Sequence, residues 1–307
     1  MRDPGKTAIR LGLCCLFRDE PIRYRQTTAK ALRTLPRQEQ LARLSALCLH
    51  NVTTLHAALH FLVGNNICAY RLPSPLFPRC THPEVGYQLD ELPNGEQARA
   101  RLATVRAFAL EHDIRLSLHP DQFNVLSSPR EEVVGNTLRE LEYQGELAEL
   151  VGAEIITLHG GGRYDGKEEA LTRLAMNFNR LSPRVRSRLA LENDDVSFTP
   201  ADLLPLCQRL AIPFIYDVHH HRCLPDSLSE EEVTTQCVAL WRHLGREPYF
   251  HLSSPKNGWG SGSPKPHAEY IAPADFPRCW LGIEATIDIE AKAKELAVLR
   301  LRRELTL

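Results

Sequence analysis

The sequence has 307 residues, of which 43% are hydrophobic, and its formal net charge is −1 with a pI of about 6.9. A nearly neutral chain lacks the overall positive charge of many nucleic-acid-binding proteins, so any DNA contact must rest on locally clustered basic residues. The nine cysteines show no C-x-x-C spacing, and an odd number without a disulfide pattern indicates a reducing compartment. Because we find neither a signal-peptide pattern nor an apolar run as long as a membrane span, we expect a cytoplasmic protein without membrane association.

Short, continuous apolar runs, typical of strands covered on both faces, recur along the chain. They lie at 9–16, 67–72, 115–119, 154–159, 188–192, 213–218, 248–252 and 279–285. Longer helical patterns lie between and after them, at 38–62, 95–111, 131–151, 167–181, 199–210, 229–244 and 289–305. The stretch 253–266 is rich in Gly, Ser and Pro, and we interpret it as a functional loop.

This alternation predicts that residues 1–307 form one α/β domain, a closed (βα)8 TIM barrel. A doubly wound open sheet is the alternative fold, and the presence of eight units favours closure.

Six consecutive predicted strands deliver a His, Asp or Glu to the barrel rim at which active sites lie. In chain order these residues are His119, His159, Glu192, Asp217, His251 and Glu284. Burying so many ionisable groups together without a cation is costly, so the pattern predicts a metal site. Imidazole and carboxylate ligands without thiolate suit Zn, Mn, Fe or Co, and the number of candidates predicts more than one ion. Clusters of two or three ions are typical of phosphodiester hydrolysis.

The segments at these strand ends resemble the UV damage endonuclease family. They are Leu118-His119-Pro120-Asp121-Gln122-Phe123, Leu158-His159-Gly160-Gly161, Leu191-Glu192-Asn193-Asp194, Asp217-Val218-His219-His220 and Phe250-His251-Leu252. Ile9-Arg10-Leu11-Gly12, Tyr70-Arg71-Leu72 and Thr81-His82-Pro83 also fit the family, so the match extends over nearly the whole chain. A wider relation includes endonuclease IV and the sugar isomerase barrels. The resemblance implies a metal-dependent enzyme of nucleotide excision repair that cuts damaged double-stranded DNA on the 5′ side of UV photoproducts or related lesions.

The resemblance also implies which residues hold the metal. The implied ligands fall into three groups, one for each ion: His119, His159 and Glu192; Glu192, Asp217, His251 and Glu284; and His220 with His267. Glu192, Asp217 and Glu284 are thereby the candidate catalytic carboxylates. We expect two or three divalent ions, Mn²⁺ first, with Zn²⁺, Co²⁺ or Mg²⁺ as alternatives. Strand alternation would put His219 beside Asp217, and the resemblance favours His220 instead.

Two positions depart from related proteins. Some family members carry a lysine at the position of Tyr249, and endonuclease IV carries an acidic ligand at the position of Lys265. These differences bear on the third metal and on the pH range of the enzyme.

Gln122 and Phe123 are implied to enter the duplex where damaged bases leave it, and the alternative is that Phe123 packs into the barrel top. Trp259 stacks on a base or packs within its own loop. Basic residues at strand ends and rim loops would form the local surface that binds phosphates. The further residues that we expect at the DNA are Arg71, His82, Lys256 and Trp259, and the wider basic set adds Arg79, Arg163, Arg222 and Lys265.

Two further motifs each have two interpretations. Gly160-Gly161-Gly162 either cradles a phosphate or lets the chain turn sharply at the rim. Asn193 and Asp194 either orient metal ligands or cap the following helix.

The leading functional hypothesis is therefore a metal-dependent DNA repair endonuclease, active as a monomer. Metal-activated water would attack the phosphorus directly, without a protein nucleophile. A divalent-metal sugar isomerase or epimerase is the alternative enzyme, and a degenerate barrel that binds damaged DNA without cutting it is the non-enzymatic alternative.

Overall fold

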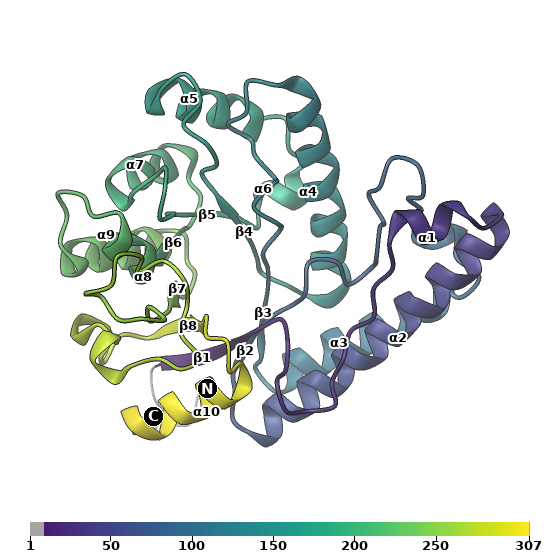
Figure 1. The fold of residues 1–307 in the computed structure, drawn as a ribbon, viewed down its shortest axis with the longest axis horizontal. Coiled ribbons are helices and arrows are strands. Elements are labelled where there is room, and N and C mark those ends of the chain that lie inside the picture. Colours follow the sequence, from purple (N-terminus) through teal and green to yellow (C-terminus); the bar gives the residue numbers. More distant parts are fainter. Residues whose placement is uncertain (1–8, 307) are drawn as a thin grey trace.

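Eight parallel strands, each hydrogen-bonded to the next and the last to the first, form a closed barrel at the centre of the molecule (Figure 1). The computed structural model describes residues 9–306. The strands are β1 (Ile9–Cys14), β2 (Ala69–Arg71), β3 (Arg115–Leu118), β4 (Ile155–His159), β5 (Leu189–Glu192), β6 (Phe214–Asp217), β7 (Tyr249–Leu252) and β8 (Ala285–Ile289). This closed order confirms the predicted (βα)8 barrel and excludes an open sheet.

Helices surround the barrel and cover the outer faces of the strands (Figure 1). They are α1 (Ala29–Arg33), α2 (Arg37–Gly64), α3 (Gly95–Glu111), α4 (Glu131–Val151), α5 (Lys167–Phe178), α6 (Pro183–Arg186), α7 (Pro200–Leu210), α8 (Val218–Cys223), α9 (Glu230–His243) and α10 (Glu295–Leu305). Short 3₁₀ turns lie at η1 (Leu89–Glu91), η2 (Pro273–Asp275) and η3 (Arg278–Trp280). The stretch 253–266 forms no helix, which confirms its interpretation as a loop.

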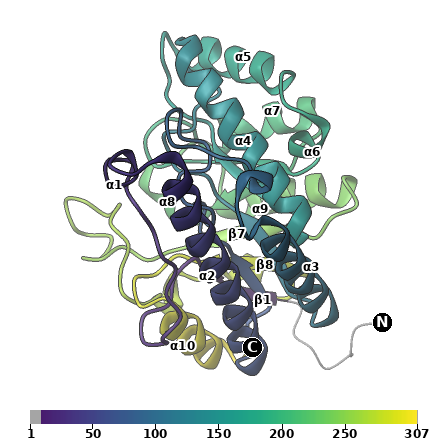
Figure 2. The ribbon, with the colours of Figure 1, turned by 90° about the vertical axis from the view of Figure 1, so that its right-hand side faces the viewer.

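The long helix α2 is the one helix of the described residues that has the length and composition of a membrane span. By length and composition alone, this helix is apolar enough to cross a membrane, with a mean hydropathy of 1.3 over its most apolar window. In the fold it lies beside α3 (Figure 2) and buries leucines such as Leu44, Leu55 and Leu62 in the core. Its apolar surface is therefore used, at least in part, within the barrel wall.

Seven predicted strands match the structure to within two residues at each end, but the eighth was placed too early. The apolar run 279–285 is a 3₁₀ turn and a loop, and Trp280 is buried there because its ring stacks on Phe250 with centroids 4.7 Å apart. The true strand, β8, carries Asp288 in its interior, which interrupts the apolar pattern. Consequently the last helix also starts later than predicted, at Glu295.

Asp288 lies inside the barrel, where side chains of β2 and β7 pair with its carboxylate. Arg71 of β2 donates to Asp288 Oδ2 at 3.0 Å, and the Tyr249 hydroxyl of β7 donates to Oδ1 at 2.9 Å. Gly12 of β1 leaves the space that this side chain needs, because a Cβ there would collide with Oδ1. A polar layer thus crosses the barrel interior just below its carboxyl-terminal mouth.

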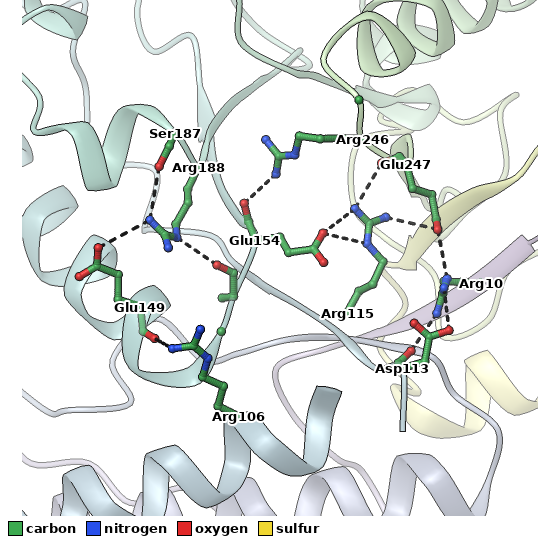
Figure 3. Close-up of a pocket in the computed structure, with 13 residues that line it drawn as sticks. Arg10, Arg106, Asp113, Arg115, Glu149, Glu154, Ser187, Arg188, Arg246 and Glu247 are labelled. Atoms are coloured by element: carbon green, nitrogen blue, oxygen red, sulfur yellow. Dashed lines mark hydrogen bonds and ion pairs between the residues drawn. The ribbon is translucent and has the colours of Figure 1, made fainter. Parts of the chain in front are cut away.

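The opposite, amino-terminal mouth is closed by a network of arginines and acidic residues (Figure 3). Arg115 is buried and donates to Glu154 Oε2 at 3.0 Å and to Thr286 Oγ1 at 2.7 Å. Arg10 lies 2.8 Å from Asp113 Oδ2 and 3.2 Å from Glu247 Oε1. Because these ion pairs join the starts of separate strands, they favour a role in stability rather than chemistry.

This network predicts that Arg115→Ala destabilises the barrel by about 3 kcal/mol, because Glu247 and Thr286 lose a buried partner. Urea unfolding measures the change through the transition midpoint. Arg106→Ala is the matched control, since Arg106 is an exposed arginine of the same pocket and donates to one carbonyl oxygen. The control should change stability by less than about 0.5 kcal/mol. An Arg115→Ala protein that unfolds at the wild-type urea concentration would refute the role of this network.

Candidate metal centre

The carboxylate of Glu192, at the end of β5, lies at the barrel mouth with 0% exposure and is surrounded by histidines. Its Oε2 is 2.9 Å from Nε2 of His119 and 3.0 Å from Nε2 of His159, and its Oε1 is 2.7 Å from Nδ1 of His251. Burial alone would raise the pKa of Glu192, but the neighbouring His251 and His159 and the hydrogen bond from His119 hold it well below its usual range. The carboxylate is therefore ionised at a point where the ends of three other strands converge.

Glu192 belongs to two overlapping groups of candidate ligands. One consists of His119, His159 and Glu192, and the other of Glu192, Asp217, His251 and Glu290. Within each group, one ligand atom from every residue lies within 4.8 Å of the others. A carboxylate shared between two such groups would bridge two cations if each group held one.

Glu284 does not reach this site, which corrects the prediction of the last ligand. It precedes β8 and is exposed at the amino-terminal end of the barrel, because the strand begins at Ala285 rather than ending there. Glu290, directly after β8, takes the expected place, with Oε1 3.5 Å from Nδ1 of His251. The local sequence signal for this strand is weak, because Asp288 interrupts its β-branched residues Thr286, Ile287 and Ile289.

The structure places His220 rather than His219 beside the shared carboxylate. Nδ1 of His220 is 2.9 Å from the carbonyl oxygen of Asn193 and 3.6 Å from both Glu192 Oε1 and Asp217 Oδ2. Burial lowers the pKa of His220, but Asp217 and Glu192 outweigh it and raise this pKa to about 9. His219 instead packs against the rings of Trp259 and His267.

His267 reaches the rim because the loop after β7 folds back on itself. Pro255 and His267 form an antiparallel bridge, and the Ala268 N–H donates to the Ser254 carbonyl at 2.8 Å. Nδ1 of His267 then lies 3.7 Å from Glu290 Oε2. All the histidines that the resemblance implies as ligands are therefore brought to one mouth.

Asn193 and Asp194 have different roles. The side chain of Asn193 accepts from the Asp217 N–H at 3.0 Å and donates to the Asp217 carbonyl at 2.8 Å, which ties the ends of β5 and β6 together. Asp194 accepts from the backbone N–H groups of Val196 and Phe198 and so shapes its own loop. Of the two, Asn193 is the residue that orients a candidate ligand.

The donor set fits a divalent cation. Among the described residues, six buried side-chain atoms have no hydrogen bond of normal geometry, and two of them are His159 Nε2 and Asp217 Oδ2. Buried polar atoms without partners are rare in folded proteins because they lose the hydrogen bonds that water would make. Both atoms belong to the ligand groups, whose nitrogen and oxygen donors suit Zn²⁺, Mn²⁺ or Co²⁺.

Arg71 is buried inside the barrel mouth, which corrects its prediction as a DNA contact. Its Nη1 donates to Glu290 Oε1 at 2.6 Å and its Nη2 to His251 Nε2 at 2.8 Å, in addition to the bond from Nε to Asp288. Burial alone would raise the pKa of Glu290, but the attraction of Arg71 and His251 holds it below its usual value. Arg71 therefore positions two candidate ligands.

Phe123 points into solvent, with 77% of its surface exposed, which contradicts the alternative that it packs into the barrel top. Its backbone N–H donates to Asp121 Oδ1 at 3.1 Å, and the Asn124 N–H donates to the Asp121 carbonyl at 2.9 Å. Asp121 thus holds a tight turn that carries both Gln122 and Phe123 at the rim, close behind the ligand His119.

Three further residues were predicted to contact DNA, His82, Trp259 and Lys256, and the structure gives each of them different surroundings. Nδ1 of His82 accepts from the Glu84 N–H at 3.1 Å, so His82 stabilises a turn and is in neither ligand group. Trp259 donates to Asp275 Oδ1 at 2.8 Å and lies against Arg222, which favours packing within its loop with part of the ring exposed. Lys256 is exposed on the same loop.

The sequence is similar to proteins that act on UV-damaged DNA. The model of the UV-endonuclease UvdE family matches residues 9–307. A UV DNA damage endonuclease from Bacillus velezensis is 31% identical over 285 residues, which cover 89% of this chain and 85% of the relative. A second, from Bacillus cereus strain Q1, is 31% identical over 288 residues, which cover 91% and 88%.

Solved structures agree in fold. The crystal structure of SacUVDE superimposes with a TM-score of 0.84 at 28% identity and covers 97% of this chain and 99% of its own. Endonuclease IV from Thermus thermophilus has a TM-score of 0.61 at 16% identity, covers 97% of each chain, and shows the fold alone. Family match, named relatives and barrel geometry agree over nearly the whole chain, and the protein belongs to the UV-endonuclease UvdE family.

Proposed function

We propose that this protein hydrolyses the DNA backbone on the 5′ side of UV photoproducts or related lesions, with water activated by divalent metal ions as the nucleophile. The observation that carries the proposal is the pair of nitrogen and oxygen ligand groups that share Glu192, on the same rim as the exposed turn of Gln122 and Phe123. Family membership and the names of the relatives support an endonuclease that acts on UV-damaged DNA.

The proposed cofactor is a set of two or three divalent ions, with Mn²⁺ as the first candidate. The residues that would hold them are His119, His159, Glu192, Asp217, His220, His251, His267 and Glu290. When bound, such ions supply an activated water and neutralise charge on the phosphate oxygens.

The chain itself contributes a rigid arrangement of ligands. Arg71 holds Glu290 and His251 by hydrogen bonds, and Asn193 holds the strand end that carries Asp217. Because these groups are fixed before substrate arrives, little reorganisation is needed when charge develops on the phosphate. Glu192 belongs to both ligand groups and therefore fixes the distance between them.

A sugar isomerase or epimerase activity has support only from fold. The barrel resembles D-psicose 3-epimerase from Clostridium cellulolyticum H10 with a TM-score of 0.56, but at 10% identity. We find no feature of the described residues that favours a sugar substrate over DNA.

Replacing Glu192 with Ala should abolish cutting of damaged duplex, by about a thousandfold or more, because both ligand groups lose their shared member. Metal analysis of the purified variant should also show less bound Mn²⁺ than the wild type. Full metal occupancy in a folded Glu192→Ala protein would contradict the bridging role.

The corrected ligand can be tested by a matched pair of variants on either side of β8. Glu290→Gln should reduce cutting about a hundredfold, since it weakens a metal ligand and its contact with Arg71. The Glu284→Gln protein should cut within about twofold of wild type, because Glu284 lies at the other end of the strand, away from the candidate ligands. The reverse order of effects would restore Glu284 as the ligand.

The lesion-probing role predicts that Phe123→Ala lowers cutting of damaged duplex by about tenfold or more, because base–aromatic stacking is worth roughly 1–3 kcal/mol. The thermal midpoint should stay close to wild type, since the ring is largely exposed. Kinetics on a duplex with a single pyrimidine dimer, with calorimetry in parallel, measure both quantities. Unchanged cleavage by the stably folded variant would exclude the role.

A further inference from the structure

Exposed apolar side chains lie on the loops at the carboxyl-terminal mouth of the barrel, where the candidate metal ligands are. Five of the eight large apolar residues that are exposed in the described part of the chain lie in loops after strand ends: Leu16, Phe123, Tyr164, Val196 and Trp259. Scattered exposed apolar residues are ordinary, but a gathering at one functional rim indicates a contact surface. Tyr164 is an aromatic member of this group that the metal chemistry does not use.

The ring of Tyr164 rests on Gly162, and 47% of the residue is exposed. A Cβ at Gly162 would lie 2.6 Å from the ring carbon Cε2, so any other residue would displace the ring. The preceding Gly161 has φ +85° and lies against Val125, where a Cβ would come within 2.6 Å of Cγ1. The glycine triplet therefore serves close packing, and the missing side chain of Gly162 leaves room for the ring of Tyr164.

Tyr164 and Phe123 lie on two loops that are joined by hydrogen bonds. The Ser127 hydroxyl donates to the Gly162 carbonyl at 3.2 Å, which joins the loop after β3 to the loop after β4. Arg173 of α5 donates from Nε to the Ser127 carbonyl at 2.9 Å and from Nη2 to the Tyr164 carbonyl. Each ring thus follows a candidate ligand histidine closely in the chain: Phe123 follows His119, and Tyr164 follows His159. The two loops that carry these rings are joined by hydrogen bonds.

We propose that Tyr164 is a second stacking residue, which packs against a nucleobase of the bound DNA while Phe123 enters the lesion. This inference rests on the proposed function and adds a residue to the DNA-binding surface. A ring already held by Gly162 and by its backbone contacts loses little conformational freedom on binding, and stacking on it does not depend on base identity. It would also provide affinity without added positive charge, in a protein whose net charge is −1.

The test measures binding without cutting, by fluorescence anisotropy in Ca²⁺ on a duplex with one pyrimidine dimer and on the undamaged duplex. Tyr164→Ala should weaken binding of the damaged duplex by about fivefold to a hundredfold, the range that loss of one stacked base corresponds to. Tyr164→Phe should bind within about twofold of wild type, because the ring and not the hydroxyl makes the contact. The dependence of affinity on salt should keep its slope in both variants, since no charge is removed.

Met176→Ala is the matched control, because Met176 is 65% exposed on α5 and lies outside the loops that follow the strand ends. Wild-type affinity of a folded Tyr164→Ala protein would overturn the inference, as would an equal loss in Tyr164→Phe or a large fall in the thermal midpoint of Tyr164→Ala. If the wild type neither binds nor cuts damaged duplex, the proposed function is wrong, and the inference about Tyr164 is wrong with it. If the wild type does both and the Tyr164 variants behave like it, the inference alone fails.

Discussion

The burial of one carboxylate, that of Glu192, is the constraint on which the rest of the site depends. A charge removed from water is costly unless other charges and hydrogen bonds compensate it, and here three imidazoles from the ends of other strands do so. The compensation continues inward, because His251 accepts from Arg71, and Arg71 is in turn paired with Asp288. The candidate metal centre therefore lies at the top of a polar layer inside the barrel, and its candidate ligands are held by partners beneath it.

The two ends of the barrel differ in how their charged groups are paired. At the amino-terminal mouth, Arg10 and Arg115 are matched by Asp113, Glu154 and Glu247, so charges are satisfied within the protein. At the carboxyl-terminal mouth, His159 and Asp217 retain buried atoms without hydrogen bonds, which an added cation would satisfy. The carboxyl-terminal end thus keeps buried nitrogen and oxygen atoms available for a cation, while the other end holds the strands together.

The rim also shows how a nearly neutral protein can engage DNA. Two arginines that the sequence suggested as phosphate contacts are paired with acidic residues: Arg71, which is buried, with Glu290, and Arg222, which is partly exposed, with Glu230. Beside exposed basic residues such as Lys256, the rim presents two aromatic rings, Phe123 on the turn held by Asp121 and Tyr164 packed against Gly162. Stacking and shape would then carry much of the recognition, in addition to the attraction between metal ions and phosphate.

Local sequence pattern was sufficient to predict the barrel and most of its candidate ligands. Buried parallel strands are short apolar runs, and in a parallel barrel every strand ends at the same mouth, so the pattern predicted His119, His159, Glu192, Asp217 and His251 together. The last strand required the folded chain, since Asp288 breaks the apolar pattern and becomes acceptable through Arg71, a partner far away in the sequence. For the same reason, the burial of Arg71 and the pairing of Asp288 with Arg71 and Tyr249 could not be predicted. Each depends on which distant side chains share its space, and no local pattern records that.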